Sequence, residues 1–294
     1  MTEIGFIGLG RMGAPMAARL AAAGHALTVL DAAAAASERF LAAHPASAAA
    51  SARELAAASE VTITMLPTSA VVAEVLRGPD GALAGLRSGA LVIEMSSGEP
   101  AATQALAAEV AAAGGELIDA PVSGGVARAL TGELAIMVGG PDAAAARAEP
   151  ILRAMGTSLL RTGAVGSAHA MKALNNLVSA AGFLVSVEAL LIGKRFGLDP
   201  AVMVDVLNAS TGVNNSTQKK LKPFVLSRAF DSGFGLDLMV KDLTIALGLA
   251  RDGGVSAPLA ALTRELWAAA LAMDLGPDHT AAARLSERLA GLEL

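Results

Sequence analysis

Three polar side chains near the middle of the chain have the types and the spacing to do chemistry. Asn175 and Asn176 follow Lys172 by three and four residues, so all three can lie on one face of a helix. The segment 173–192 is otherwise largely apolar, and burying an ammonium group is costly unless its charge is compensated. An ammonium group in such a segment therefore calls for a partner or a task.

Two other interpretations of this segment remain open. Lys172 could extend from the mouth of a buried helix while the Asn side chains bond to neighbouring backbone groups. The run 173–192 is also long enough for a membrane span. The polar residues that interrupt it are Asn175, Asn176, Ser179, Ser186 and Glu188. They favour a helix of a soluble protein that is buried on most sides.

The composition limits the class of protein. The 294 residues are 54% hydrophobic and 17% charged, which provides apolar material for a large core and length for two domains. The net charge is −5, and no run of Lys or Arg occurs. Because nucleic acids and anionic membranes attract basic surfaces, neither is an expected partner.

Cysteine and histidine usage removes further kinds of site. The chain has no Cys, which excludes disulfides, thiol nucleophiles and zinc–thiolate centres. The four His residues lack metal-ligand spacing, so we expect surface or capping roles for them and no metal site. The N-terminus enters a strand pattern without a signal-like segment, which favours a cytoplasmic location.

A glycine-rich turn near the N-terminus follows a predicted strand at 3–7 and precedes a predicted helix at 14–23 and a strand at 26–30. This context makes G-x-G-x-x-G a specific signature of dinucleotide binding. The first glycine allows the tight turn, the second lets the backbone approach a pyrophosphate, and the third lets the helix pack on the strand. The turn consists of Gly8, Leu9, Gly10, Arg11, Met12 and Gly13. A glycine-rich turn without a ligand is the alternative.

Asp31 ends the strand predicted at 26–30. A carboxylate at this place can accept hydrogen bonds from the adenosine ribose and would repel a 2′-phosphate. No Lys or Arg follows until Arg39, so no cation is at hand for that phosphate. NAD is therefore the preferred cofactor, with NADP second. Asp31 could instead cap the next helix.

Strands and helices continue to alternate up to residue 140. Residues 32–58 are predicted to form two helices broken at Pro45; further strands are expected at 61–66, 91–95, 117–121 and 134–138, and helices at 70–76 and 101–113. Such repetition indicates a doubly wound parallel sheet, which binds ligands at the carboxyl ends of its strands. The loops at Pro67, Ser97 and Ser123 should then surround one crevice.

The loop Ser123-Gly124-Gly125 combines one hydroxyl with successive unhindered amides. Such a loop can form a concave anion site suited to a small carboxylate. A turn of the same composition without function is common, and only its position at a strand end favours a site.

Beyond Gly166 the pattern is helical. A long helix is expected at 167–196 with Gly197 as its C-cap, and shorter helices at 201–209, 239–251, 257–273 and 279–290; a polar loop is expected at 208–217. The chain is thus α/β, with an N-terminal doubly wound Rossmann domain (1–162) and an all-α C-terminal domain (163–294). The long helix joins the two without a flexible linker.

Four motifs in this order resemble those of the β-hydroxyacid dehydrogenase family. They are Gly5–Gly13, Asp119–Gly125, Gly166–Asn176 and Lys241-Asp242-Leu243. The resemblance covers essentially the whole chain. It implies hydride transfer between NAD, or NADP, and a short 3-hydroxy acid or its semialdehyde, in a homodimer or homotetramer.

The resemblance also implies roles for residues at matching positions. Gly8 to Gly13 would hold the pyrophosphate, while Leu66, Pro67 and Ser97 line the cofactor cleft. Ser123, Gly124 and Gly125 would bind the substrate carboxylate. Lys172 would be catalytic, Asn176 with Asn175 would orient the substrate, and Lys241, beside Asp242, would close over the cofactor. Ser97 replaces a frequent Thr, and Val213 stands where some members carry Arg, which leaves the substrate open.

Rival enzyme classes fit less well. The absence of Tyr excludes a Tyr-x-x-x-Lys reductase, and His169 has no evident acidic partner for the His–Asp chemistry of lactate- and malate-type enzymes. Imine reductases usually lack a Lys at the position of Lys172, so its presence favours carbonyl chemistry. Two non-catalytic alternatives are a dinucleotide-binding sensor, disfavoured by Lys172, Asn176 and Ser123, and a nucleic-acid reader, disfavoured by the acidic charge.

Overall fold

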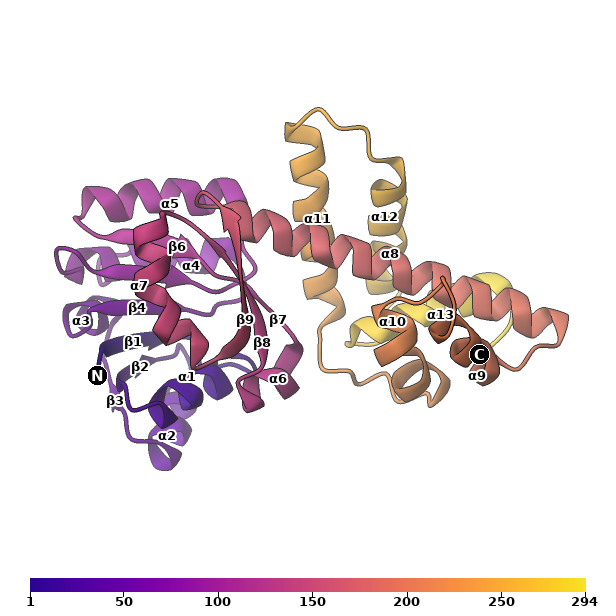
Figure 1. Cartoon of the computed structure of the whole chain (residues 1–294), viewed down its shortest axis with the longest axis horizontal. Helices are drawn as coiled ribbons and strands as arrows, with labels where there is room; N and C mark the ends of the chain where they lie inside the picture. Colours follow the sequence, from indigo (N-terminus) through magenta and orange to yellow (C-terminus); the bar gives the residue numbers. More distant parts are fainter. The chain divides into compact units, whose positions relative to one another are not determined.

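The computed structural model describes all 294 residues, which form two compact units, Met1–Lys172 and Ala173–Leu294. The division between the units falls inside one long helix, ten residues beyond the boundary that the sequence predicts near 162. Figure 1 shows a layered α/β unit followed by a unit built from helices alone.

Six parallel strands form the main part of the sheet in the first unit. They are β1 (Glu3–Ile7), β2 (Ala26–Leu30), β3 (Ser47–Ala48), β4 (Val61–Thr64), β5 (Leu91–Glu94) and β6 (Glu116–Asp119). Their order is β3-β2-β1-β4-β5-β6. In this doubly wound order β2 and β3 are added on one side of β1, and β4 to β6 on the other. Such sheets bind ligands at the point where the order switches, between β1 and β4. The predicted Rossmann class is confirmed.

The far end of the sheet differs from the prediction. Three strands extend it: β7 (Val122–Ser123), β8 (Leu134–Gly139) and β9 (Gly156–Gly163). β8 is antiparallel to both β6 and β7, and β9 is parallel to β8. The expectation of a wholly parallel sheet is therefore wrong here, because an apolar run such as 134–138 carries no information on strand direction.

Helices cover both faces of the sheet. One face packs on α1 (Gly13–Ala22), α6 (Gly125–Thr131) and α7 (Asp142–Arg153), the other on α3 (Ala52–Ala57), α4 (Ser69–Arg77) and α5 (Pro100–Ala112), while α2 (Ala34–Ala43) follows β2. The sequence did not predict α6 and α7. The buried face of α7 consists mainly of alanine, and Pro150 lies inside the helix, a position where proline normally ends a helical pattern.

The second unit consists of helices around one apolar core. They are α8 (Ser167–Phe196), α9 (Pro200–Asn208), α10 (Asn215–Lys219), α11 (Leu236–Asp252), α12 (Pro258–Ala272) and α13 (Ala283–Ala290), with a π-helical turn at Leu221–Leu226 and a 3-10 turn at His279–Ala282. α11 and α12 pack as an antiparallel hairpin (Figure 1). α10 lies partly in the predicted polar loop, since Asn214 and Thr217 form a capping box rather than a coil.

α8 begins and ends at the predicted residues, and Gly197 follows it at a φ of 105°. Its length and composition would suit a membrane span, but half of its most apolar stretch is buried inside the protein. The buried residues include Ala180, Phe183 and Val187, spaced as one helix face. α8 is thus a core helix of the second unit.

The packing of Phe183 gives a test of this core. Phe183 is fully buried and lies 5.7 Å from Trp267, the single Trp of the chain, between ring centroids. We expect Phe183→Ala to lower the free energy of unfolding by about 3–5 kcal/mol, because it leaves a cavity. Urea unfolding followed by Trp267 fluorescence measures the change. Phe196→Ala, at a side chain that is 85% exposed on the same helix, should have little effect.

Candidate active site

The glycine-rich turn between β1 and α1 is built by close backbone packing at two positions. Gly8 has a φ of 102°, and a Cβ there would lie 2.3 Å from the carbonyl oxygen of Met65. A Cβ at Gly13 would lie 1.8 Å from the carbonyl oxygen of Gly8. Both positions therefore require glycine for the fold itself.

Gly10 differs from these two glycines. No atom lies within 4 Å of the place where its Cβ would be, and Gly10 and Arg11 are exposed. No side chain caps the N-terminus of α1 at Met12. An open space at an uncapped, electropositive helix end fits a pyrophosphate, so the residues present suit a dinucleotide.

Asp31 ties the end of β2 to this turn. Its Oδ2 accepts a hydrogen bond of 2.7 Å from the N–H of Leu9, and its Oδ1 accepts one of 2.8 Å from the N–H of Ala33. The second bond goes to Ala33, the residue before α2, and no side chain caps that helix, so the alternative capping role of Asp31 is wrong. The carboxylate is half-buried, and each oxygen keeps capacity to accept a bond from a ribose hydroxyl.

The loops after β4 and β5 are bonded to each other. The N–H of Leu66 donates to Oγ of Ser96 (2.9 Å), and the N–H of Ser96 donates to Oε1 of Glu94 (2.8 Å). These bonds fix the backbone that carries Pro67 and Ser97. Because β1 and β4 are neighbouring strands, the Leu66 loop also lies beside the glycine turn.

The Ser123-Gly124-Gly125 loop forms the turn between β7 and α6. Gly124 and Gly125 have φ values of 133° and 67°, which residues with a Cβ rarely adopt. A Cβ at Gly125 would meet no atom within 4 Å. The loop therefore presents backbone close to open space, beside the partly exposed side chain of Ser123.

A buried carboxylate at the end of β6 anchors the start of α8. Asp119 accepts hydrogen bonds from the N–H groups of Gly166 (2.8 Å) and His169 (2.9 Å). It thus supplies the capping interaction that the first turn of a helix needs. The sequence shows Asp119 only as part of a motif, because its hydrogen-bond partners lie 47 and 50 residues further along the chain.

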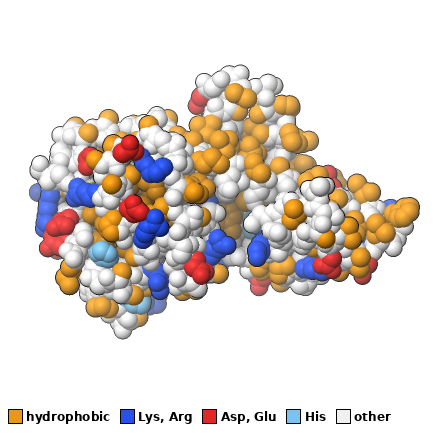
Figure 2. All heavy atoms as spheres, in the orientation of Figure 1, with side chains coloured by type: hydrophobic (Ala, Val, Ile, Leu, Met, Phe, Trp, Pro, Cys, Tyr) orange, Lys and Arg blue, Asp and Glu red, His pale blue; other side chains and the backbone are white.

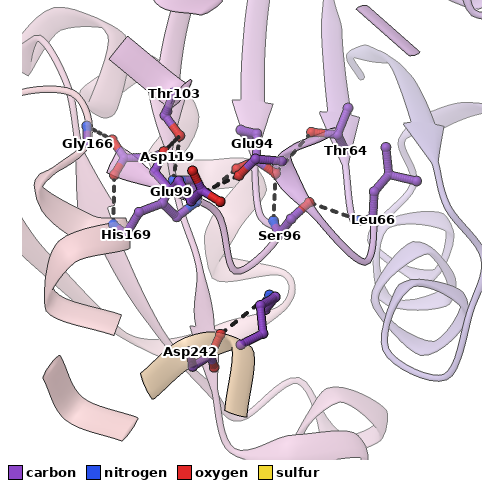
Figure 3. A network of polar contacts seen from close by, with 12 residues as sticks. Thr64, Leu66, Glu94, Ser96, Glu99, Thr103, Asp119, Gly166, His169 and Asp242 are labelled. Atoms are coloured by element: carbon purple, nitrogen blue, oxygen red, sulfur yellow. Dashed lines mark hydrogen bonds and ion pairs between the residues drawn. The ribbon is translucent and has the colours of Figure 1, made fainter. Parts of the chain in front are cut away.

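His169, in the same turn of α8, forms a second buried anchor (Figure 3). Its Nε2 lies 2.8 Å from Oε2 of Glu94, and its Nδ1 lies 2.8 Å from Oγ1 of Thr103. The expectation that His169 lacks an acidic partner is wrong, because Glu94 is remote in sequence and reaches it only through the fold. The expectation of surface or capping roles for the histidines also fails for His169 and His279, which are both buried and bond to other side chains.

The contact between Glu94 and His169 shifts the pKa of both residues. Burial alone would raise the pKa of Glu94, but the charge and hydrogen bond of His169, with hydrogen bonds from Ser96, lower it. Burial alone would lower the pKa of His169, but the negative charge and hydrogen bond of Glu94, with the charge of Asp119, raise it. Each group thus favours the charged form of the other.

The three polar residues of α8 lie one turn further on. Lys172 and Asn176 are only 8% and 7% exposed, and Asn175 is half-buried. Nδ2 of Asn175 donates to Oδ1 of Asn176 (3.2 Å), and Nδ2 of Asn176 donates to Oδ2 of Asp242. These two hydrogen bonds, one to the oxygen and one from the nitrogen, fix the orientation of the Asn176 carboxamide.

Asp242 also contacts a second predicted residue. Nζ of Lys241 lies 3.4 Å from Oδ1 of Asp242 on α11. In the second unit the structure thus brings together Asn175, Asn176, Lys241 and Asp242. The other predicted site residues all belong to the first unit: Gly8 to Gly13, Asp31, Leu66, Pro67, Ser97, Ser123, Gly124, Gly125 and Lys172.

The sequence did not reveal the supporting roles of three polar residues: Glu94, Asp119 and His169. The signal for the first two was available, since each ends a buried strand with a carboxylate. No group of three or more His, Asp or Glu side chains is placed to hold a metal ion.

Comparisons with known proteins place this architecture in a family. Residues 3–166 match the family model of the NAD binding domain of 6-phosphogluconate dehydrogenase. Residues 166–286 match the model described as the NAD-binding region of NADP-dependent 3-hydroxyisobutyrate dehydrogenase.

Individual relatives align over nearly the full chain. The chain is 35% identical to 2-(hydroxymethyl)glutarate dehydrogenase of Eubacterium barkeri, over 99% of this chain and 97% of the relative. It is 39% identical to 3-hydroxyisobutyrate dehydrogenase of Pseudomonas aeruginosa, over 91% of each. The structure of Mycobacterium tuberculosis 3-hydroxyisobutyrate dehydrogenase with L-serine is 34% identical, with a TM-score of 0.89, over 97% of this chain and 98% of that one.

These matches run through both units in the same order as the four motifs. The protein belongs to the β-hydroxyacid dehydrogenase family of NAD(P)-dependent oxidoreductases.

Proposed function

We propose that the protein transfers a hydride between NAD and a short 3-hydroxy acid or its semialdehyde, with Lys172 as the catalytic residue. The observation that carries the proposal is the burial of the Lys172 ammonium group one turn before Asn176, on a helix anchored to the carboxyl ends of β5 and β6. Those strand ends border the Rossmann sheet's ligand edge.

The cofactor site would use the residues that leave open space. Gly10 and the N-terminus of α1 would hold the pyrophosphate, and Asp31 would bind the adenosine ribose. Leu66, Pro67 and Ser97 would line the cofactor cleft, and Lys241 would close over the bound cofactor. The bound nicotinamide supplies the hydride chemistry.

The protein side chains would handle orientation and the proton. Ser123, Gly124 and Gly125 would bind the substrate carboxylate, while Asn176, held by Asp242 and Asn175, would orient the reacting oxygen. During reduction the Lys172 ammonium would donate a proton to the carbonyl oxygen, and during oxidation its neutral amine would accept the hydroxyl proton. An unperturbed Lys titrates at about 10.4, so reduction uses the form that is present at neutral pH.

The relatives' names differ in substrate, and Val213 stands in a partly exposed loop near α10. We therefore test the substrate with a panel of small semialdehydes and 3-hydroxy acids, including 3-hydroxyisobutyrate and tartronate semialdehyde. Turnover is read from NADH absorbance and repeated with NADPH. A protein that binds NADH but turns over no member of the panel would be the dinucleotide-binding sensor instead.

We propose a cytoplasmic location, where NAD is available for such a reaction.

The catalytic assignment predicts the effect of removing one amine. We expect Lys172→Ala to lower kcat by a factor on the order of 10² to 10⁴, as for loss of a general acid or base, while NADH still binds. Steady-state kinetics and NADH fluorescence titration measure the two effects. Lys194→Ala, the same substitution at a partly exposed position of α8, serves as the matched control. Near-normal turnover of Lys172→Ala would contradict the assignment.

The position of Asp31 predicts cofactor preference. Asp31→Asn keeps an acceptor for the Leu9 N–H but removes the charge that would repel a 2′-phosphate. We expect the ratio of kcat/KM for NADPH to that for NADH to rise on the order of tenfold, equivalent to about 1.4 kcal/mol. An unchanged ratio with intact folding would show that Asp31 only holds the glycine turn.

We further propose that α8 pairs with a second copy of the chain. Val178, Val185 and Ile192 are 73%, 61% and 72% exposed and recur every seven residues, which gives an apolar seam along α8. Figure 2 shows further hydrophobic side chains at the surface over the α11–α12 hairpin and the C-terminal end of α8. An exposed seam of this kind supports a homodimer, or a homotetramer built from dimers.

If the apolar seam of α8 joins two chains, a charge introduced into it should lower the mass of the species in solution. We expect Val185→Glu to shift the species seen by light scattering toward a single chain of 29.2 kDa, because a charge at the centre of the seam opposes burial. Leu130→Glu, at an exposed position of α6 in the first unit, should leave the mass unchanged. A wild-type protein that is already monomeric would refute the proposal.

A further inference from the structure

The buried pair of His169 and Glu94 has no part in the proposed reaction, yet it lies in the turn of α8 that precedes Lys172. His169 lies three residues before Lys172, so the two Cα atoms lie less than one turn apart. Buried ion pairs add little stability in general, and replacing both partners by uncharged groups is often neutral. A buried pair at this place therefore calls for an explanation other than stability.

The hydrogen bonds around His169 determine its protonation. Oγ1 of Thr103 lies within hydrogen-bond distance of the carbonyl oxygen of Glu99 (3.1 Å) and of Nδ1 of His169 (2.8 Å), and its single hydrogen can go to only one of them. When the hydroxyl donates to Glu99, it accepts a hydrogen bond from Nδ1 of His169. On the other side of the ring, Nε2 faces the carboxylate of Glu94 at 2.8 Å. In that arrangement both ring nitrogens carry hydrogens and the side chain is an imidazolium, the form that the negative charge of Glu94 favours by raising the pKa of His169.

The pair is also connected to the loops of the proposed cofactor cleft. Ser96 donates its N–H to Glu94 and accepts the N–H of Leu66 through its hydroxyl (Figure 3). A Cβ added to Gly98 would lie 3.1 Å from the ring of His169, so the loop that holds Ser97 packs directly on the imidazolium. The loops after β4 and β5 and the first turn of α8 thus share one buried network.

Each element packed on the ring contributes a defined group. β5 presents the carboxylate of Glu94, β6 presents that of Asp119, and α5 presents the hydroxyl of Thr103. Lys172 lies less than one turn further along α8. Two buried carboxylates against one imidazolium leave one negative charge, which the helix N-terminus and the Lys172 ammonium group can offset.

We propose that His169 and Glu94 are positioning residues, which as a buried imidazolium–carboxylate pair hold the first turn of α8 against the ends of β5 and β6 and so place Lys172 relative to the cofactor loops. The inference rests on the proposed catalytic role of Lys172. A displacement of the amine of about 1 Å can cost on the order of 10²-fold in rate, so the pair matters for turnover even where the fold tolerates its loss.

Single and double variants test the proposal. Glu94→Gln keeps the shape and the acceptor for Ser96 but removes the charge. We expect Glu94→Gln to lower kcat by about 10- to 100-fold while the Kd of NADH and the KM of the substrate change less than about twofold. The double variant Glu94→Gln/His169→Gln removes both charges and should regain thermal stability without regaining kcat. Recovery of kcat together with stability would reduce the pair to a structural role and overturn the proposal.

The charge state has its own readout, independent of turnover. Nitrogen chemical shifts of His169 should report an imidazolium at pH 7 in the wild type and a neutral ring in Glu94→Gln. A neutral ring in the wild type would overturn the proposal even if Lys172 is catalytic. Conversely, a charged ring together with full activity of Lys172→Ala would refute the proposed function and leave the buried ion pair established.

Stability should follow pH in a defined window. The raised pKa of His169 gives a contribution that is complete below the ordinary value of 6.5 and is lost as pH rises through the folded-state pKa. The lowered pKa of Glu94 gives one that is present above 4.5 and is lost as pH falls through the folded-state pKa. The difference in Tm between wild type and Glu94→Gln should therefore be largest between pH 4.5 and 6.5. A difference that does not vary with pH would contradict the ion pair.

Discussion

Two carboxylates are buried at the carboxyl ends of adjacent strands, and the rest of the site depends on how their charge is compensated. Asp119 is satisfied by backbone N–H groups of α8, and Glu94 by an imidazolium from the same turn. An isolated buried carboxylate would be strongly unfavourable, and groups from the start of α8 compensate both charges. The helix that carries Lys172 is thereby fixed by electrostatics at its origin rather than by apolar packing alone.

Successive parts of α8 make different kinds of contact. Its first turn binds the Rossmann sheet, the next two turns carry Lys172, Asn175 and Asn176, and the remainder packs Phe183 and Val187 into the core of the second unit. One continuous helix thus carries, in order, the anchoring turn, the polar residues of the candidate site and the residues of the second unit's core.

The parts of this structure that follow from local rules were predictable. The glycine turn, the strand at 61–64 and the bounds of α8 depend on spacing and periodicity within one segment. Two kinds of feature were not predictable. α7 buries alanine, which gives little hydrophobic contrast, and the reversal of β8 depends on pairing with β6 and β7 rather than on its own residues. The partnership of His169 with Glu94 depends on the finished fold, because nothing near His169 in the sequence is acidic.

The three glycines of the N-terminal turn differ in what holds them in place. Substitution of Gly8 or Gly13 would collide with the chain's own backbone, whereas Gly10 faces open space. A descendant that no longer needed a dinucleotide would therefore keep the first and third glycines to preserve its fold and would be free to drift at the second. Among homologues, the identity of the residue at this middle position is a more informative marker of retained ligand binding than the presence of a glycine-rich turn as such.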